Sequence, residues 1–184
     1  MHILLKAVST FLLLSALSVA NATIATEVSS DSTGKTEFSE YQFTKVGEAE
    51  LSVLFWSIYN STLYSLDGSF NENQRPLKLE INYFRDIEAA DLISKTAEEW
   101  MQQGLNHHNQ ELWLQQLTNI WPNIKEDDTL TFIVDEHNNS YFLFNKQNIG
   151  HINDQEFANH FLAIWLSEKT SRPKLRTKLL GITK

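Results

Sequence analysis

Tyr83 and Arg85 are the two side chains in this sequence whose types and spacing best suit the binding of a small acid. They stand where an apolar strand predicted over residues 77–83 gives way to a helix. Residues 83 and 85 share a parity, so both side chains project to one face if the strand continues to Arg85. A guanidinium donates two parallel hydrogen bonds to a carboxylate, and a phenol can add a third. The pair therefore predicts a carboxylate anchor.

A structural role for Arg85 is the alternative. Asp86 and Glu88 follow within three residues, and an ion pair with either carboxylate would only hold the turn into the helix. Substitution separates the two roles. An Arg85→Met change weakens ligand binding if Arg85 is an anchor, and lowers the melting temperature if it is structural.

The remaining polar clusters lack the spacing that catalysis or metal binding needs. Adjacent His107 and His108 point apart on any regular element, and the acidic run 126–128 lacks the alternating oxygen ligands of a calcium loop. Nucleotide-binding, zinc-protease and serine-hydrolase motifs are missing from the sequence. The chain has no Cys, which excludes thiol nucleophiles, disulfides and Cys-ligated metals. We therefore expect no catalytic residue, no metal and no cofactor.

The composition indicates one acidic domain with a substantial core. The chain has 184 residues, of which 42% are hydrophobic and 11% aromatic, enough to bury one core but too short for two well-sized domains. It carries 15 Lys and Arg against 23 Asp and Glu, a net charge of −8. This balance argues against a general nucleic-acid partner, because phosphate binding needs a basic surface.

Basic residues gather in one place, from Lys169 to Lys184, a stretch that contains no acid. One interpretation is a solvated helix face whose cations favour the helix C-terminus. The other is a weak docking face for an anionic partner or for membrane headgroups.

The first residues have the features of an export signal. An apolar run over residues 7–20 follows Lys6 and ends in the small-x-small sequence that closes at Ala22. The run is shorter than the roughly 20 residues that a membrane span needs. We therefore expect a signal peptide over residues 1–22, a flexible leader over 23–40 and a single domain over 41–184. The mature chain is expected in the periplasm, without a transmembrane segment.

Hydrophobic periodicity predicts the elements that position the Tyr83–Arg85 pair. Strands are predicted over residues 51–64, 77–83, 129–134, 141–144 and 149–152, the first being one long strand or two with a bend. Helices are predicted over residues 89–101, 112–121, 153–165 and 173–180, the third starting with a capping box between Asn153 and Glu156. Neighbouring strands joined by hairpin turns indicate an antiparallel α+β domain.

Four segments, in this order and spacing, resemble the exported bacterial branch of the chalcone isomerase-like family. They read VGEAELSVLFWSIYNSTLY, LKLEINYFRDIEAADLISKTAEEW, WPNIKEDDTLTF and GHINDQEFANHFLAIWLSEKTSRPKLRTKLLG. The likeness spans residues 41–181, and YFRDI matches a Y-x-R-x-I pattern that recurs in that branch. The resemblance implies an open-faced β-sandwich, in which a curved antiparallel sheet packs against a layer of helices with a cleft between them.

The resemblance also implies two candidate activities. Plant members of the family close a chalcone ring, whereas other members bind fatty acids through an Arg and a Tyr. Aligned with the enzyme, this chain has Tyr59 in place of the active-site Thr and Gly47 near the position of the Arg. Glu88 and Asp91 fall where the enzyme has its Tyr and Lys. No cation therefore stands at the aligned positions that hold the phenolate.

We therefore expect a non-catalytic periplasmic protein that binds a small amphipathic ligand such as a fatty acid. The ligand-binding candidates are Arg85, Tyr83 and, through the alignment alone, Tyr59. Two alternatives stay open. One is a structural or interaction protein whose cleft is filled by its own side chains, and the other is an isomerase with a rearranged site.

Overall fold

The computed structural model describes Phe38 and residues 40–182. The predicted signal peptide over residues 1–22 lies outside the described residues, and so does the predicted leader up to residue 37. Phe38 is buried against Ile133 and Leu143, with Tyr41 packed beside them. The packed part of the chain thus includes a residue that precedes the predicted domain start at residue 41.

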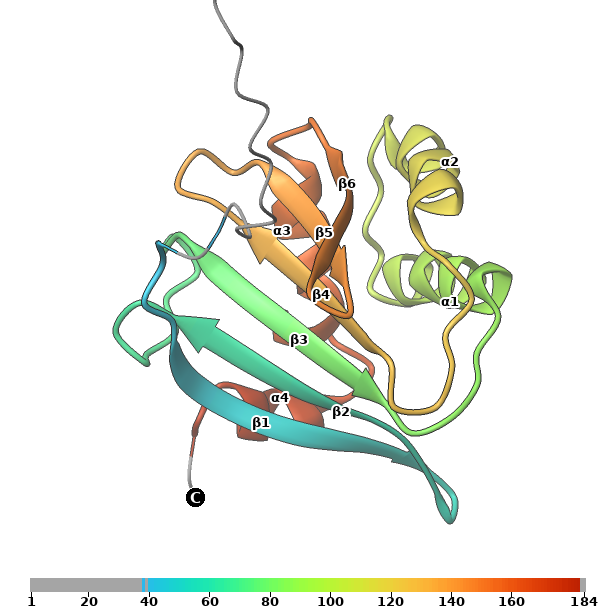
Figure 1. Cartoon of the computed structure of the whole chain (residues 1–184), viewed down its shortest axis with the longest axis horizontal. Coiled ribbons are helices and arrows are strands. Elements are labelled where there is room, and N and C mark those ends of the chain that lie inside the picture. The colour runs from blue at the N-terminus through green and yellow to red at the C-terminus, as the bar shows by residue number, and fades with distance from the viewer. Residues whose placement is uncertain (1–37, 39, 183–184) are drawn as a thin grey trace, which may run out of the picture. The chain divides into compact units, whose positions relative to one another are not determined.

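Six antiparallel strands form one curved sheet in chain order, from β1 at one edge to β6 at the other (Figure 1). Each strand pairs with the next one along the chain, and the two are joined by a hairpin or by a longer connection. This antiparallel arrangement confirms the α+β prediction. The strands are β1 Thr44–Val53, β2 Trp56–Ser65, β3 Leu77–Tyr83, β4 Thr129–Val134, β5 Ser140–Phe144 and β6 Gln147–Ile152.

β3 shows most clearly why the sequence forms this sheet. Its burial alternates strictly from Leu77 to Tyr83, so every second side chain enters the core and the others lie at the opposite face. This half-buried pattern is the one that period-2 hydrophobicity encodes.

The long apolar segment that begins at Leu51 forms a hairpin. Val53 pairs with Trp56, which leaves Leu54 and Phe55 as a two-residue turn between β1 and β2. Leu54 has a left-handed backbone, with a φ of 59°. The sequence allows one strand or two with a bend, and the structure has two strands joined by a tight reversal.

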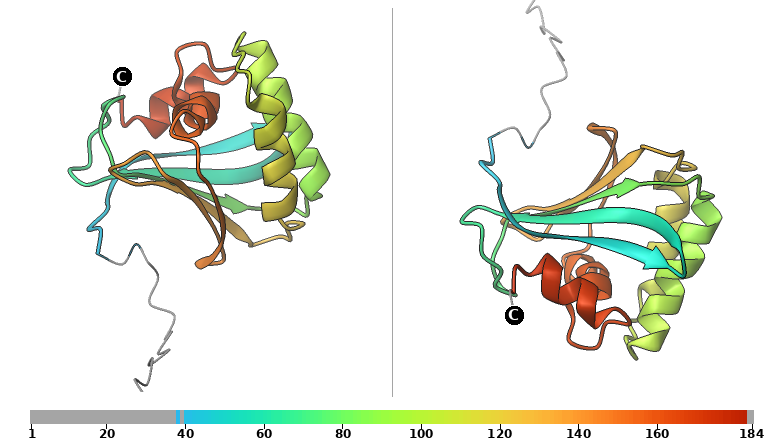
Figure 2. Two further views of the ribbon diagram at one scale, coloured as in Figure 1. Left: turned by 90° about the horizontal axis from the view of Figure 1, so that it is seen from above. Right: turned by 90° about the horizontal axis from the view of Figure 1, so that it is seen from below.

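Four helices complete the domain. Figure 2 shows α3 and α4 against one face of the sheet, with α1 and α2 packed beside each other across one end of it. Within residues 38 and 40–182, no helix combines the length and apolar character that crossing a membrane requires. The helices are α1 Ala89–Gln102, α2 Gln110–Ile120, α3 Phe157–Leu166 and α4 Pro173–Leu179.

The predicted capping box at the start of α3 does not form. The helix begins at Phe157, and no side chain caps its N-terminus. Asp154 Oδ1 instead accepts a hydrogen bond from the backbone N–H of Glu156 at 3.0 Å. The polar residues before α3 form a turn that ends at Glu156, so Asn153 and Glu156 both lie outside the helix.

The last helix packs very closely against the first strand. A Cβ added at Gly47 of β1 would lie 2.3 Å from the carbonyl oxygen of Lys178. Only a glycine at position 47 lets the backbones of β1 and α4 approach in this way. The contact holds α4, and the segment leading into it, over the face of the sheet.

Candidate functional site

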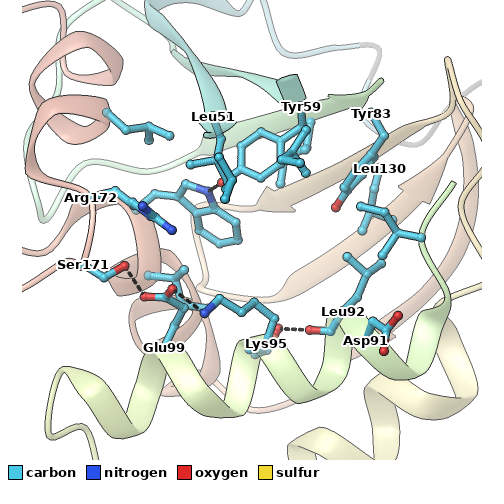
Figure 3. A pocket seen from close by; sticks show the side chains of 18 of the residues that line it. Leu51, Tyr59, Tyr83, Asp91, Leu92, Lys95, Glu99, Leu130, Ser171 and Arg172 are labelled. Atoms are coloured by element: carbon cyan, nitrogen blue, oxygen red, sulfur yellow. Dashed lines mark hydrogen bonds and ion pairs between the residues drawn. The ribbon is translucent and has the colours of Figure 1, made fainter. Parts of the chain in front are cut away.

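A cavity of about 390 Å³ lies between the sheet and helices α1, α3 and α4. Its volume falls in the range of small-molecule pockets. Most of the lining is aliphatic or aromatic, and the charged groups come from α1 and from the segment before α4 (Figure 3). The sheet contributes Leu51, Val53, Ile58, Tyr59, Ile81, Tyr83 and Leu130, and the helical side includes Leu92, Trp121, Phe161, Ile164, Trp165 and Leu175.

Two phenols face this cavity from neighbouring strands. Tyr59 of β2 and Tyr83 of β3 are directly paired in the sheet, and their rings meet edge to face with centroids 5.9 Å apart. Tyr59 accepts a hydrogen bond from the Trp165 indole at 3.1 Å, so its own O–H remains available to donate. Burial raises the pKa of Tyr59 to about 12, and burial also raises the pKa of Tyr83. Both phenols are therefore neutral donors at physiological pH.

A buried carboxylate lies at the helical side of the cavity. Glu99 of α1 is 7% exposed, and its carboxylate accepts a hydrogen bond from Ser171 Oγ at 2.6 Å. Lys95, one turn earlier on α1, approaches the same carboxylate at 3.4 Å and that of Glu98 at 3.0 Å. Lys95 thus supplies the partner charge that the buried Glu99 carboxylate requires. Its own charge is already shared between two acids.

Arg172 is the other cation of the lining. It precedes α4 and lies on the same side of the cavity as Ser171 and Glu99, whereas Tyr83 and Leu130 lie on the opposite side (Figure 3). Its guanidinium has no hydrogen-bond or ion-pair partner within residues 38 and 40–182. The positive charge of Arg172 also favours the ionised form of Tyr59, although burial outweighs this effect. Arg172 is therefore a cation at an apolar cavity with its donors unused.

The lining contains one further unused donor. Trp121 is 6% exposed, and its indole N–H is buried without a partner in the described part of the chain. Leaving a buried donor unsatisfied costs about 1–3 kcal/mol. Three types of donor, a guanidinium, two phenols and an indole, thus belong to one largely apolar cavity.

Arg85 does not line the cavity, which corrects the expected geometry of the pair. β3 ends at Tyr83, so the parity argument stops before Arg85. Tyr83 is buried, whereas Arg85 is exposed and its guanidinium lies 4.4 Å from the centroid of the Trp56 ring. The alternative ion pair does not form either: Asp86 bonds Lys125 at 2.7 Å, and Arg85 is within ion-pair distance of neither Asp86 nor Glu88. Tyr59 and Tyr83 do lie in the lining, and their role in ligand binding stays a prediction.

The residues of this chain that align with the active site of the plant enzyme do not all lie at the cavity. Gly47 faces the backbone of α4, which leaves no room for a side chain there. Glu88 precedes α1 and is exposed, whereas Asp91 lines the cavity. Cations reach the cavity from other positions, Lys95 and Arg172, which the alignment does not identify.

The His107 region is a packed structural cluster away from this cavity. The His107 ring stacks on Trp113 with centroids 4.4 Å apart, and its Nε2 lies 2.9 Å from a Glu156 carboxylate oxygen. In the described part of the chain, His, Asp and Glu nowhere gather in a group of three or more that could hold a metal.

Comparison with known proteins places the chain in a family. The family model for chalcone isomerase-like proteins matches residues 28–181, so the chain belongs to the chalcone isomerase-like family. An uncharacterized protein of Haemophilus influenzae is 30% identical over 139 residues, which cover 76% of this chain and 68% of the relative. The fold is similar to that of a fatty-acid binding protein of Arabidopsis thaliana, with a TM-score of 0.59 and 12% identity. That likeness covers 76% of this chain and 87% of the plant protein.

Proposed function

We propose that this chain is a non-catalytic protein that binds one amphipathic acid, such as a fatty acid, in the cavity between sheet and helices. The observation that carries the proposal is an apolar cavity with an unpaired guanidinium, Arg172, on one side. The tail of the acid would lie among the aliphatic and aromatic side chains. Its carboxylate would accept hydrogen bonds from Arg172, supported by the Tyr59 hydroxyl. The name and fold of the Arabidopsis protein support the same class of ligand.

The cavity volume favours a medium chain length. At roughly 30 Å³ for each water-sized group, the cavity holds about 13 carbon and oxygen atoms, one fewer than dodecanoic acid contains. Burying about ten methylenes contributes about 8 kcal/mol before the cost of association is subtracted. With one charge-assisted hydrogen bond, the net affinity is of order tens of micromolar. A cleft filled by the chain's own side chains would not leave this volume.

Calorimetric titration with dodecanoic acid tests the proposal. Arg172→Met should weaken binding by about tenfold, the lower end for a charged hydrogen bond because Arg172 is exposed. Lys174→Met is the matched control, because Lys174 is an exposed cation two residues away that does not line the cavity. Wild-type protein that binds no acid, or equal weakening in both variants, would contradict the proposal.

An isomerase with a rearranged site is the second candidate. It is favoured by the two cations, Lys95 and Arg172, in a cavity that also holds two phenols. The rate of chalcone cyclisation separates the candidates. The binding proposal expects the uncatalysed rate, whereas a thousandfold acceleration, about 4 kcal/mol of transition-state stabilisation, would favour the enzyme.

We further propose that the protein acts in the periplasm. The support is the apolar run before Ala22 and the small residues on either side of Asn21. Sequencing the N-terminus of protein recovered from the cell envelope should find Thr23 first. A membrane-bound form that keeps residues 1–22 would contradict this location.

A further inference from the structure

The tip of the β1–β2 hairpin is the most exposed apolar part of the described chain. Its four consecutive residues are Val53 at 42% exposure, Leu54 at 87%, Phe55 at 98% and Trp56 at 60%. We call these four residues the hairpin tip. The turn extends beyond the rest of the sheet in Figure 1. Apolar side chains that are exposed together, rather than singly, mark an interaction surface.

The turn residues are poorly suited to the turn they form. A two-residue hairpin loop with a left-handed first residue normally has glycine there, and this chain has Leu54 with a φ of 59°. A branched side chain in that region of backbone space is strained. Folding alone would favour glycine at position 54, so the leucine points to a role outside the fold.

The same hairpin forms one wall of the cavity. Leu51, Val53 and Ile58 line the cavity, and Val53 also belongs to the hairpin tip. Val53 therefore joins the apolar lining of the cavity to the exposed tip.

The charges around the hairpin tip restrict what it can contact. Arg85 lies over the Trp56 ring and has no acidic partner in the described residues. Acidic residues 126–128 lie in the loop between α2 and β4, where Asp127 and Asp128 are hydrogen-bonded to the backbone of Tyr83, two residues before Arg85. The whole chain carries a charge of −8. A strongly anionic surface would therefore repel the protein. A zwitterionic phospholipid surface supplies a phosphate for Arg85 and an apolar layer for Leu54 and Phe55.

A bilayer also fits the shape of the tip better than a second protein chain does. Four projecting side chains bury less than the roughly 800 Å² per partner that a stable interface needs. A bilayer accepts a convex apolar tip without a complementary pocket, and Trp and Arg are well placed at the headgroup level.

We propose that the hairpin tip inserts into the surface of a zwitterionic phospholipid bilayer, and that the amphipathic ligand passes between the bilayer and the cavity along the hairpin. The passage of ligand rests on the proposed function, whereas insertion of the tip does not. Leu54 and Phe55 enter the acyl layer, Trp56 lies at the interface, and Arg85 contacts lipid phosphate.

The absence of Cys from the sequence allows a direct test, because a single introduced Cys can be labelled alone. Phe55→Cys, carrying an environment-sensitive dye, should brighten and shift to the blue when phosphatidylcholine vesicles are added. Met101→Cys is the matched control, an apolar residue of α1 that is 72% exposed. A response at both positions, or at neither, would overturn the proposal. A response at position 55 that depends on protein concentration without vesicles would assign the tip to a second copy of the chain.

A second variant tests the tip without threatening the fold. The double change Leu54→Gly and Phe55→Ser supplies residues that suit the turn, so its melting temperature should equal or exceed that of the wild type. Its partition onto phosphatidylcholine vesicles should fall about tenfold or more. Anionic lipid in the vesicles should not raise the binding of the wild type. Unchanged partition of the double variant would overturn the proposal.

Titration with dodecanoic acid in the absence of vesicles keeps this inference separate from the proposed function. The double variant should bind the acid as the wild type does, because neither Leu54 nor Phe55 lines the cavity. If the wild type inserts into vesicles but binds no acid, the tip proposal holds and the proposed function fails. If the wild type binds the acid but position 55 does not respond to vesicles, the proposed function holds and the tip proposal fails.

Discussion

The cavity and the hairpin tip are both apolar, but the rest of the chain covers only the cavity. Phe161 of α3 lines the cavity and is 2% exposed, whereas Phe55 in the tip is 98% exposed. The same residue type therefore stabilises the fold in one region and leaves it nearly unaffected in the other. Burial, and not residue type, separates the part of the apolar surface that builds the core from the part that is free for contacts.

The largest expected effect is a difference in unfolding free energy between two Phe→Ala variants. Phe161→Ala should destabilise the protein by about 3–5 kcal/mol, since it removes a buried ring and enlarges the cavity. Phe55→Ala should change stability by no more than about 0.5 kcal/mol. Urea unfolding measures both, and a similar loss in the two variants would contradict the distinction between the regions.

A substitution at Gly47 sharpens the comparison by moving the helical side of the cavity. Gly47→Ala places a methyl group against the α4 backbone, which should cost about 1–3 kcal/mol and weaken acid binding, because Arg172 and Leu175 belong to that segment. Gly104→Ala is the control, with open space around its Cβ but a φ of 70°, and should cost about 1 kcal/mol through strain alone. Urea unfolding and dodecanoic acid titration together separate clash from strain. Unaltered acid binding by the Gly47 variant would show that α4 does not position the anchor.

The stability that the cavity contributes should fall at alkaline pH, whereas the hairpin tip contains no titratable side chain. The pKa of Tyr59 is raised by burial from its ordinary value of 10.0 to about 12, so the folded state keeps a proton that the unfolded state releases. Stability from this group is complete below pH 10 and is lost as the pH rises through about 12. The difference in urea midpoint between pH 9 and pH 11.5 should be smaller in Tyr59→Phe than in the wild type. An identical pH dependence would mean that Tyr59 does not govern this loss.

The smallest expected effect belongs to Arg85. Arg85→Met should leave both the unfolding free energy and the affinity for dodecanoic acid within about 0.5 kcal/mol of the wild type, since Arg85 is exposed and outside the cavity. Calorimetric titration of Arg85→Met and Arg172→Met in parallel measures the difference in their affinity for the acid. A larger loss of affinity for Arg85→Met than for Arg172→Met would return the anchor to the Tyr83–Arg85 pair.

Periodicity predicts most of this fold because burial imposes it. The alternation over Leu77–Tyr83 and the helical stripe around Trp100 both correspond to elements with one face in the core. The β1–β2 turn could not be predicted with the same certainty. Leu54 and Phe55 have none of the usual turn chemistry, so the segment allows an uninterrupted strand.

The candidate site was harder to predict than the fold. Tyr83 lies in the cavity because it is on the core face of a predicted strand, whereas Tyr59 is identified only through the alignment with the plant enzyme. Arg85 was misplaced because parity applies only while the strand continues. Arg172 belongs to a basic stretch that looks like a solvated helix face. No local pattern reveals that it borders a cavity lined by strands β1 to β4, which are distant from it in the sequence.

The close packing of Gly47 against Lys178 also has a consequence for the order of folding. These residues are about 130 positions apart, so the contact closes a loop that includes most of the domain. Contacts between such distant residues form late, after local hairpins and helices. We expect pulsed hydrogen exchange to find amides of α4 protected after those of the β1–β2 and β4–β5 hairpins. The cavity would then acquire its Arg172 side only when the C-terminal segment docks, which makes a ligand-competent state the product of a completed chain.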